Sequence, residues 1–329
     1  MTDRSNPSAS AIGLPDDGRG TVVTVGTFDG VHRGHWAVLS EIRSRAQATG
    51  RRAVLVTFEP HPLRVVRPEA APSLLTTAAE KKEILAQSGL DYAVFLKFTP
   101  ELSRYSPRRF VEEILVAGLR VEELVIGYDH GFGRGRSGDA ETLGMIGKEL
   151  GFDVDVVGPI RFDGVAVSSS EIRKAVRSGE LERARAALGR PYSLRGSVVA
   201  GEGRGRELGV PTANLRIGDA DKLVPTAGIY AVVATTRRGT FPGALHIGPR
   251  PTFEGASPSI EVHLIDYGGP DLYGEEVRLD LIRYLRPVIG FETVAELVTT
   301  MNRDIVEAKQ VLAAESGLFE QGERNNLKG

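Results

Sequence analysis

The spacing of apolar residues changes once along this chain, and that change predicts two kinds of structure. From Thr21 to about Gly158, short apolar runs alternate with helical patterns, which is typical of a parallel sheet covered by helices on both faces. From Leu194 onward the apolar residues alternate with a period of two in short runs separated by Gly and Pro. Those runs predict a closed antiparallel β domain. A length of 329 residues also favours two domains.

The first pattern predicts a Rossmann-like α/β domain, and the second an antiparallel β-barrel with a terminal helix. Strands are expected at 21–26, 51–58, 91–98, 122–127 and 153–158, with helices at 37–49, 78–88, 107–117 and 139–150 between them. Two short helices are expected at 168–178 and 181–188, and barrel strands at 195–201, 228–236, 243–248, 259–266 and 276–285. The last helix has its apolar positions at Val294, Leu297, Val298, Met301, Ile305 and Val306.

The composition excludes several classes of function. A formal net charge of -2 provides no global positive field for a nucleic acid. Without cysteine there is no disulfide, no thiolate metal site and no cysteine nucleophile, which fits a cytoplasmic protein. Residues 1–20 lack the apolar core of a signal peptide, and no run approaches a membrane span, so a membrane partner is not expected. The sequence does not decide whether the protein forms a homo-oligomer.

The decapeptide GTFDGVHRGH, Gly26 to His35, lies directly after the first predicted strand and before the first helix. Backbone amides and the helix dipole favour phosphate at such a place. His32 and His35 are three apart, so both rings can converge on one polyphosphate. They would donate hydrogen bonds and, when protonated, positive charge to the transition state of a phosphoryl-type transfer. On the residues alone, a glycine turn with polar loop histidines remains the alternative.

A second candidate site lies in a glycine-rich stretch, because the chain has no Walker loop. Backbone amides of such a loop can approach phosphate oxygens. Thr212 and Asn214 are two apart in an extended segment and point to one face, where two neutral oxygens suit Mg²⁺. A flexible hairpin loop followed by an ordinary strand would also explain the pattern. The loop residues are Gly201, Gly203, Arg204, Gly205, Arg206, Gly209 and Pro211.

The stretch SIEVHLID, 259–266, alternates strictly. Its period of two sends Ile260, Val262 and Leu264 to one side. Glu261 and His263 then lie on the other side, which a solvent-exposed face would fully explain.

Both motif sets resemble known signatures. The decapeptide reproduces the H-x-G-H pattern of the nucleotidylyltransferase superfamily and is similar to its flavin-adenylating branch, and the glycine-rich loop running into PTAN resembles that of riboflavin kinases. Together they resemble the prokaryotic bifunctional riboflavin kinase/FAD synthetase family from about Thr21 to Gly317. The resemblance implies that the chain uses ATP and Mg²⁺ in two reactions. The C-terminal domain, 190–317, would convert riboflavin to FMN, and the N-terminal domain, 21–189, would convert FMN to FAD. Polar tails would be 1–20 and 318–329.

Further segments match this family in the expected order: FEPHP (58–62), GYDHGFG (127–133), VSSSEIR (167–173), GPRPTF (248–253), DLYG (271–274) and RYLRP (283–287). The resemblance implies that Glu261 is the kinase base, that His32 and His35 act in adenylyl transfer, and that Thr212 and Asn214 bind the metal. The implied flavin-binding residues are Glu59, Pro60, His61 and Arg286. The implied nucleotide-binding residues are Gly26, Thr27, Phe28, Asp29, Gly34, Gly127, Asp129, Ser169, Ser170, Arg173, Gly203, Gly205, Arg206, Gly209 and Pro211.

Three departures from the family pattern, at Trp36, Gly131 and Pro249, and two alternatives accompany this interpretation. The family often carries Arg where this chain has Gly131, and Arg134 or Arg136 would then take its place. Gly133 to Gly138 satisfies G-x-G-x-x-G, with Asp153 as a ribose-binding acid, so a dinucleotide-dependent flavoprotein is an alternative. A regulatory flavin- or nucleotide-binding module with inactive sites is the other.

Overall fold

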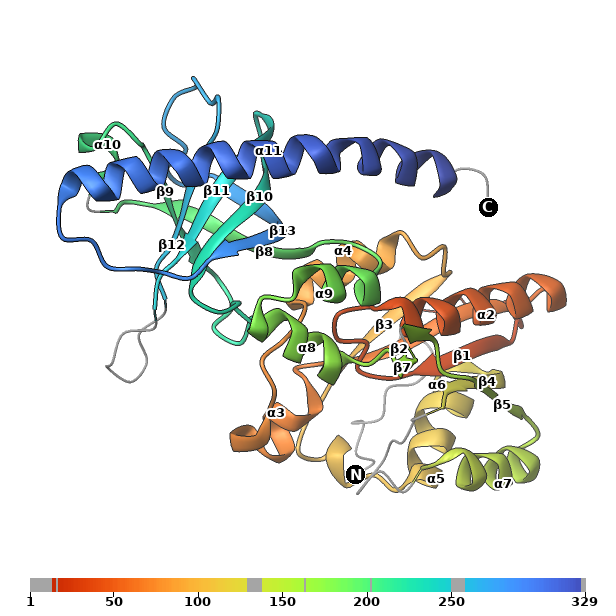
Figure 1. Cartoon of the computed structure of the whole chain (residues 1–329). Coiled ribbons are helices and arrows are strands. Elements are labelled where there is room, and N and C mark those ends of the chain that lie inside the picture. The colour runs from red at the N-terminus through yellow and green to blue at the C-terminus, as the bar shows by residue number, and fades with distance from the viewer. Residues whose placement is uncertain are drawn as a thin grey trace. The chain divides into compact units, whose positions relative to one another are not determined.

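The computed structural model describes residues 14–15, 17–128, 138–162, 164–201, 203–249 and 258–326, with side chains given as far as residue 315 and not for Arg204. The chain packs as two compact units, Met1–Ser169 and Ser170–Gly329. Figure 1 traces the elements of each. The boundary predicted between residues 189 and 190 concerns the division of activities, and it stays a prediction.

A parallel five-stranded sheet forms the centre of the first unit, as the alternating pattern predicts. Its order is β3-β2-β1-β4-β5, and every pairing is parallel. β1 pairs with both β2 and β4, so the strand order reverses beside β1, and ligands bind at such a point beyond the carboxyl ends of the strands. The strands are β1 (Thr21–Val25), β2 (Arg52–Glu59), β3 (Tyr92–Lys97), β4 (Val121–Gly127) and β5 (Asp153–Val157).

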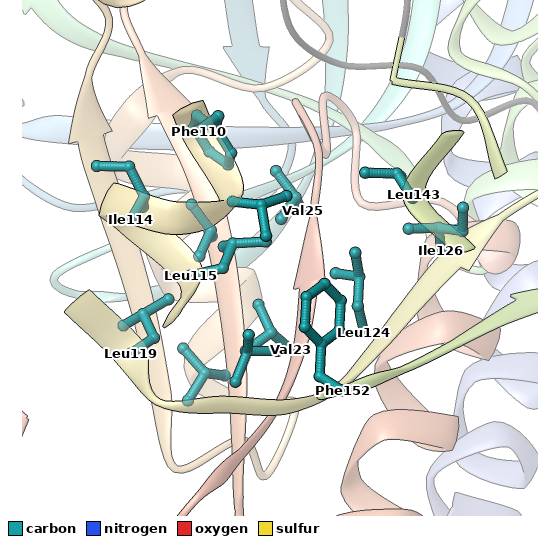
Figure 2. Close-up of a cluster of buried hydrophobic side chains, with 14 of the residues drawn as sticks. Val23, Val25, Phe110, Ile114, Leu115, Leu119, Leu124, Ile126, Leu143 and Phe152 are labelled. Atoms are coloured by element: carbon teal, nitrogen blue, oxygen red, sulfur yellow. The ribbon is translucent and has the colours of Figure 1, made fainter. Parts of the chain in front are cut away.

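Helices cover both faces of this sheet, which explains why β1 is buried along its whole length. On one face, α2 (Arg33–Thr49) and α4 (Ala78–Ala86) bury apolar side chains against the strands. The other face packs against the helical stretch from 107 to 119 and against α7 (Ala140–Leu150). Figure 2 shows this second cluster, in which Val23 and Val25 lie among Phe110, Ile114, Leu115, Leu119, Leu124, Ile126, Leu143 and Phe152.

Several local elements differ from the sequence-based expectations. α2 begins at Arg33 rather than at 37, because His32 caps the helix and brings the polar RGH stretch into its first turn. The helix expected at 107–117 is α5 (Pro107–Phe110), a π-helical segment η3 (Val111–Val116) and α6 (Ala117–Leu119) in succession. Short elements that were not predicted are α3 (Pro62–Val66), η1 (Pro68–Ala70), η2 (Leu102–Arg104), β6 (Arg161–Phe162) and β7 (Val165–Ala166).

The second unit contains a closed antiparallel barrel of six strands, in the order β10-β11-β12-β9-β8-β13. Alternate residues fill its interior: on β12, Ile260, Val262 and Leu264 are buried while Glu261 and His263 face outward, as predicted. The strands are β8 (Tyr192–Val199), β9 (Ala213–Ile217), β10 (Gly228–Thr236), β11 (Gly239–Ile247), β12 (Ile260–Leu264) and β13 (Glu276–Arg286). The helices are α8 (Ser169–Ser178), α9 (Leu181–Leu188), α10 (Arg204–Glu207) and α11 (Val294–Asn326).

The terminal helix α11 runs along the outside of the barrel, beside β10 and β11 (Figure 1), and continues into the stretch predicted as a polar tail. The predicted apolar face is wrong in part, since Val294 is 63% exposed and Val306 is 55% exposed. The helix instead docks through Asp304, Ala308 and Leu312, which recur every four residues and are buried. Small Ala308 allows close approach to the barrel. Because Asp304 is charged, the spacing of apolar residues alone does not reveal this docking face.

Candidate active sites

The decapeptide between β1 and α2 has an unusual backbone. Phe28 and Val31 adopt positive φ angles of 48° and 37°, and Gly30 lies at 82°. Side chains at positive φ are strained, most of all β-branched ones, and such strain gathers at functional sites. Burial of both Phe28 and Val31 holds them in place. Gly26 is also required, because a Cβ there would lie 2.9 Å from the Phe28 ring.

His32 and His35 form a capping box with their rings, a role that Ser and Glu play more often. Nδ1 of His32 accepts a hydrogen bond from the His35 amide, and Nδ1 of His35 accepts one from the His32 amide, each at 3.3 Å. The rings stack with centroids 3.6 Å apart. An Nδ1 that accepts an N–H carries no proton, so each neutral ring presents its N–H at Nε2. The pair is therefore built as two donors with a fixed tautomer.

Asp29 anchors the same loop to the segment that precedes α4. Its buried carboxylate accepts hydrogen bonds from the backbone amides of Leu75 and Thr76, all at 3.0 Å, and from the Thr76 hydroxyl at 3.2 Å. The Gly30 amide donates to the Thr76 hydroxyl oxygen at 3.0 Å. The resemblance assigns Asp29 to nucleotide binding. Its hydrogen bonds show that its carboxylate also holds the loop in place.

Two other predicted segments lie near this loop. The Ser169 hydroxyl donates to the Asp29 carbonyl oxygen at 2.9 Å, which places Ser169 of VSSSEIR beside the decapeptide. The Thr57 hydroxyl, two residues before Glu59 at the end of β2, donates to the Thr27 carbonyl oxygen at 3.0 Å. Both contacts gather predicted site residues at the carboxyl end of the sheet.

The remaining first-site residues are placed as follows. Pro60 follows a cis peptide bond, and Nδ1 of His61 caps α3 by accepting the Leu63 amide at 3.2 Å. Ser170 is exposed and Arg173 is buried on α8. Gly34 packs against the His32 ring, 3.2 Å from a Cβ at that position. Gly127 ends β4, whereas Asp129, Gly131, Arg134, Arg136 and most of the Gly133–Gly138 motif lie outside the described residues.

The glycine-rich stretch of the second unit forms a close-fitting cradle around the start of β9. A Cβ at Gly201 would lie 2.1 Å from the side-chain nitrogen of Asn214, and one at Gly205 would lie 2.5 Å from the Val210 carbonyl oxygen and 3.0 Å from the Thr212 hydroxyl. Gly203 and Gly209 adopt φ angles of 76° and 79°, where only glycine is unstrained. The glycines are thus fitted to two polar side chains, which a flexible loop does not require.

Thr212, Asn214 and Glu261 lie together on the outer face of the barrel. The Thr212 hydroxyl donates to the Glu261 carboxylate at 3.3 Å. Asn214 is directly opposite Glu261 in the β9–β12 register, and opposed side chains in an antiparallel pair share a face. His263 bonds through Nδ1 to the Pro211 carbonyl oxygen at 2.8 Å and so supports the same segment. The structure therefore brings the predicted base and both predicted metal ligands together.

The two predicted arginines of this site carry ion pairs. Arg206 contacts Asp271 of DLYG at 2.6 Å, and both side chains are exposed. Arg286 makes a two-pronged pair with buried Asp304 of α11, at 2.8 and 2.6 Å, and this pairing raises its pKa above the ordinary value. Arg286 therefore joins the barrel to the terminal helix, whatever it binds.

Comparison with known proteins matches each unit to a family model. A FAD synthetase model matches residues 14–171, and a riboflavin kinase model matches residues 188–312. A bifunctional riboflavin kinase/FMN adenylyltransferase of Pseudomonas fluorescens is 37% identical over 301 residues, which is 91% of this chain and 96% of that protein. The chain belongs to the bifunctional riboflavin kinase/FMN adenylyltransferase family.

A second member of the family and one solved structure are also similar to this chain. The bifunctional enzyme of Escherichia coli K12 is 36% identical over 292 residues, covering 88% of this chain and 92% of its own length. A crystal structure from Streptococcus pneumoniae, described as a macrolide-efflux protein, superposes with a TM-score of 0.83 at 28% identity, covering 92% of this chain and 97% of the other. Within the described residues, no helix is both long and apolar enough to cross a membrane.

A divalent cation at the second site would be held by only a few side chains of the described residues. No cluster of three His, Cys, Asp or Glu residues suited to a metal occurs in the described part of the chain. The cradle of Gly201 and Gly205 closes directly on the side chains of Asn214 and Thr212, beside the Glu261 carboxylate. Neutral oxygens next to one carboxylate suit Mg²⁺, which keeps several waters and shares the phosphates of a nucleotide. The residues present therefore fit the ion.

Sequence reasoning missed two polar residues at the sites. His246 on β11 lies opposite Glu261 in the register. Burial lowers the pKa of its imidazole, which the nearby Glu261 carboxylate opposes and Arg286 reinforces. Lys81 of α4 is buried and reaches the decapeptide. A signal for the lysine was available, since Lys81 and Leu85 are four apart on the buried face of a helix that Thr77 and Glu80 begin with a capping box.

Proposed function

We propose that the two activities of the family are divided between the two predicted domains, with the kinase at 190–317 and the adenylyltransferase at 21–189. The chain is a riboflavin kinase and an FMN adenylyltransferase that uses ATP in both reactions. Riboflavin, FMN and ATP are its small-molecule substrates. The two reactions follow each other, because the phosphorylated product of the first is the acceptor in the second.

In the kinase reaction Glu261 acts as the general base. It takes the proton from the ribityl 5′-hydroxyl of riboflavin while that oxygen bonds to the γ-phosphorus of ATP, and the bond from the γ-phosphorus to the bridging oxygen breaks to release ADP. The observation that supports this role is the 3.3 Å contact with Thr212 on the face that Asn214 shares. A carboxylate held there is close to the site proposed for the phosphates.

Thr212 and Asn214 are the residues proposed to hold Mg²⁺ at the kinase site. When bound, the ion offsets the negative charge of the phosphates. The chain itself contributes the shape of the cradle: the amides of the loop that contains Gly203, Gly205 and Gly209 are free of Cβ atoms that would keep phosphates away. Arg206 and Pro211 complete this proposed nucleotide-binding loop.

In the adenylyl transfer, an oxygen of the FMN phosphate bonds to the α-phosphorus of a second ATP, and pyrophosphate leaves. The attacking oxygen is already anionic, so no base is required, and stabilisation of charge on the phosphates dominates. His32 and His35 supply two Nε2–H donors whose tautomer is fixed by their capping bonds. Gly26, Thr27, Phe28, Asp29, Gly34, Gly127, Asp129, Ser169, Ser170 and Arg173 form the proposed nucleotide site.

Flavin recognition is assigned to both units. We assign Glu59, Pro60 and His61 to the flavin of the adenylyltransferase and Arg286 to that of the kinase. The position of Glu59 at the carboxyl end of β2 supports the first assignment. No nucleic acid or membrane is expected as a partner, and a cytoplasmic location is proposed. The dinucleotide-reading alternative at Gly133–Gly138 lies within the stretch that the FAD synthetase model matches.

A single substitution separates the two reactions. We expect Glu261→Gln to lower riboflavin phosphorylation by about a thousandfold, the usual effect of a lost general base. The same protein, supplied with FMN and ATP, should form FAD at the wild-type rate. The products are separated by chromatography after incubation with riboflavin, ATP and Mg²⁺. Unchanged phosphorylation in this variant would remove Glu261 as the base, and a wild-type protein that makes neither FMN nor FAD would overturn the function itself.

A further inference from the structure

Lys81 is a buried cation that the proposed reactions do not use. It lies in the second turn of α4, and its side chain is 6% exposed. Its neighbour Lys82 is exposed, although both ammonium groups lie over the Phe95 ring, at 5.8 and 5.2 Å from its centroid. Lysine is rarely buried unless it has a partner or a task. The two adjacent lysines therefore differ mainly in burial and in what they contact.

The partners of Lys81 belong to the adenylyl-transfer loop. Its Nζ donates to the Thr27 carbonyl oxygen at 3.1 Å and to the Thr57 hydroxyl oxygen at 3.5 Å. The Thr57 hydroxyl donates to the same Thr27 carbonyl at 3.0 Å. Thr27 directly precedes Phe28, the first residue of positive φ in the loop. Two donors thus fix the carbonyl at the point where the strained turn begins.

The charges around Lys81 indicate why a cation is present there. Asp29 of the loop and Glu59 of β2 act on the ammonium electrostatically, and burial lowers its pKa while these two carboxylates oppose that shift. Lys82 is the other cation on the same helix turn. Without Lys81, the charges of these two carboxylates would not be offset by its ammonium near the loop proposed to bind ATP and the phosphate of FMN. Like charges so placed weaken the binding of an anion.

We propose that Lys81 is a positioning residue for FMN adenylylation, whose Nζ fixes the Thr27 carbonyl and offsets the charges of Asp29 and Glu59, so that the loop presents His32 and His35 to an anionic substrate. The inference rests on the adenylyltransferase function of the first unit. It adds a buried cation to that site. Asp29 and Lys81 then tie the loop to the α4 region at two points, one through the amides before α4 and the other from within that helix.

The test compares Lys81→Met with Lys82→Met in the full-length protein. Both variants remove one ammonium from neighbouring positions of α4, but only the first removes the contacts with Thr27 and Thr57. Initial rates of FAD formation from FMN and ATP are measured for kcat and KM. Riboflavin phosphorylation by the same samples is the internal control, and thermal unfolding reports on the fold.

We expect Lys81→Met to lower kcat/KM for FAD formation by about tenfold or more, the effect of losing a hydrogen bond from a charged group. Lys82→Met should stay within about twofold of the wild type, a change too small for such a bond. Riboflavin phosphorylation should be unchanged in both. The Lys81→Met protein should stay folded at the assay temperature, because the Thr57 hydroxyl still donates to the Thr27 carbonyl oxygen.

A pH profile gives a readout that a merely structural lysine would not move. Because the pKa of Lys81 is lowered, its charge is lost before that of an ordinary lysine as the pH rises. FAD formation by the wild type should fall over that alkaline range, and the residual activity of Lys81→Met should not.

Three results would overturn the proposal: equal rates in Lys81→Met and the wild type, equal losses in the two lysine variants, or a loss of both reactions together with a lower melting temperature. Each would show that Lys81 has no specific part in the reaction. A wild-type protein that forms no FAD from FMN and ATP would instead overturn the function on which the inference rests.

Discussion

The two proposed ATP sites of this chain are built by different structural means. The first is a strained loop that Asp29 and Lys81 tie at two points to the α4 region. The second places half-buried Glu261 and Asn214 on regular strands, beside a loop in which four positions require glycine. The chemistry explains the contrast. An anionic nucleophile requires fixed donors and charge balance, whereas a hydroxyl nucleophile requires a base at a defined position.

Among three further predictions, the largest expected effect tests whether His32 serves as a donor or only as a helix cap. His32→Asn keeps a side chain that caps helices well but moves the donor away from the Nε2 position. We expect FAD formation to fall about a hundredfold, as when one transition-state donor is removed. Thermal stability should stay near that of the wild type, and His32→Ala should lose about 1 kcal/mol of stability in addition.

The measurements for this variant are FAD formation and thermal unfolding, with riboflavin phosphorylation as the control within the same chain. If His32→Asn keeps the wild-type rate of FAD formation, the histidine acts only as a cap, and the contrast between the two sites loses its chemical basis.

An intermediate effect tests whether the glycine cradle of the second site is fitted or merely flexible. Gly205→Ala places a methyl group 2.5 Å from the Val210 carbonyl oxygen. We expect a tenfold loss of riboflavin phosphorylation, in line with the roughly 1–3 kcal/mol that overpacking costs. Gly218→Ala, where a Cβ meets nothing within 4 Å, is the matched control. Similar rates in the two variants would show that the loop is a flexible connection.

The smallest expected effect concerns pH. Since burial lowers the pKa of His246, the folded barrel disfavours its charged form. Its contribution to stability is present above the ordinary histidine value of about 6.5 and is lost as the pH falls through the lowered pKa. Glu261 and Arg286 are the charged groups that act on it. The melting temperature of the wild type should therefore fall more on acidification than that of His246→Asn.

Thermal unfolding of both proteins at neutral and at acidic pH checks this expectation. Equal decreases in melting temperature would mean that protonation of His246 does not affect the stability of the fold. Together with the alkaline loss of FAD formation expected from Lys81, the result would show that the two units respond to opposite ends of the pH range.

Much of the architecture was predictable because it depends on local periodicity. A period of two placed Glu261 on the face opposite Val262, and the motif order placed the decapeptide after β1. The apolar face of α11 was predicted wrongly at Val294 and Val306, because the docking surface includes a buried carboxylate that only its partner Arg286 makes tolerable. A search for apolar spacing excludes such a residue.

By itself, the sequence determined the change from a parallel sheet to a barrel, the two motif sets and the residues on each strand face, because these follow from neighbours along the chain. Only the tertiary structure decided the burial of Lys81 against Thr27, the use of Asp29 as an anchor and the positive φ of Val31. The first two depend on segments 46 to 54 residues apart in the chain. Such long-range pairing holds a cation and a strained turn in place, and no local pattern encodes it.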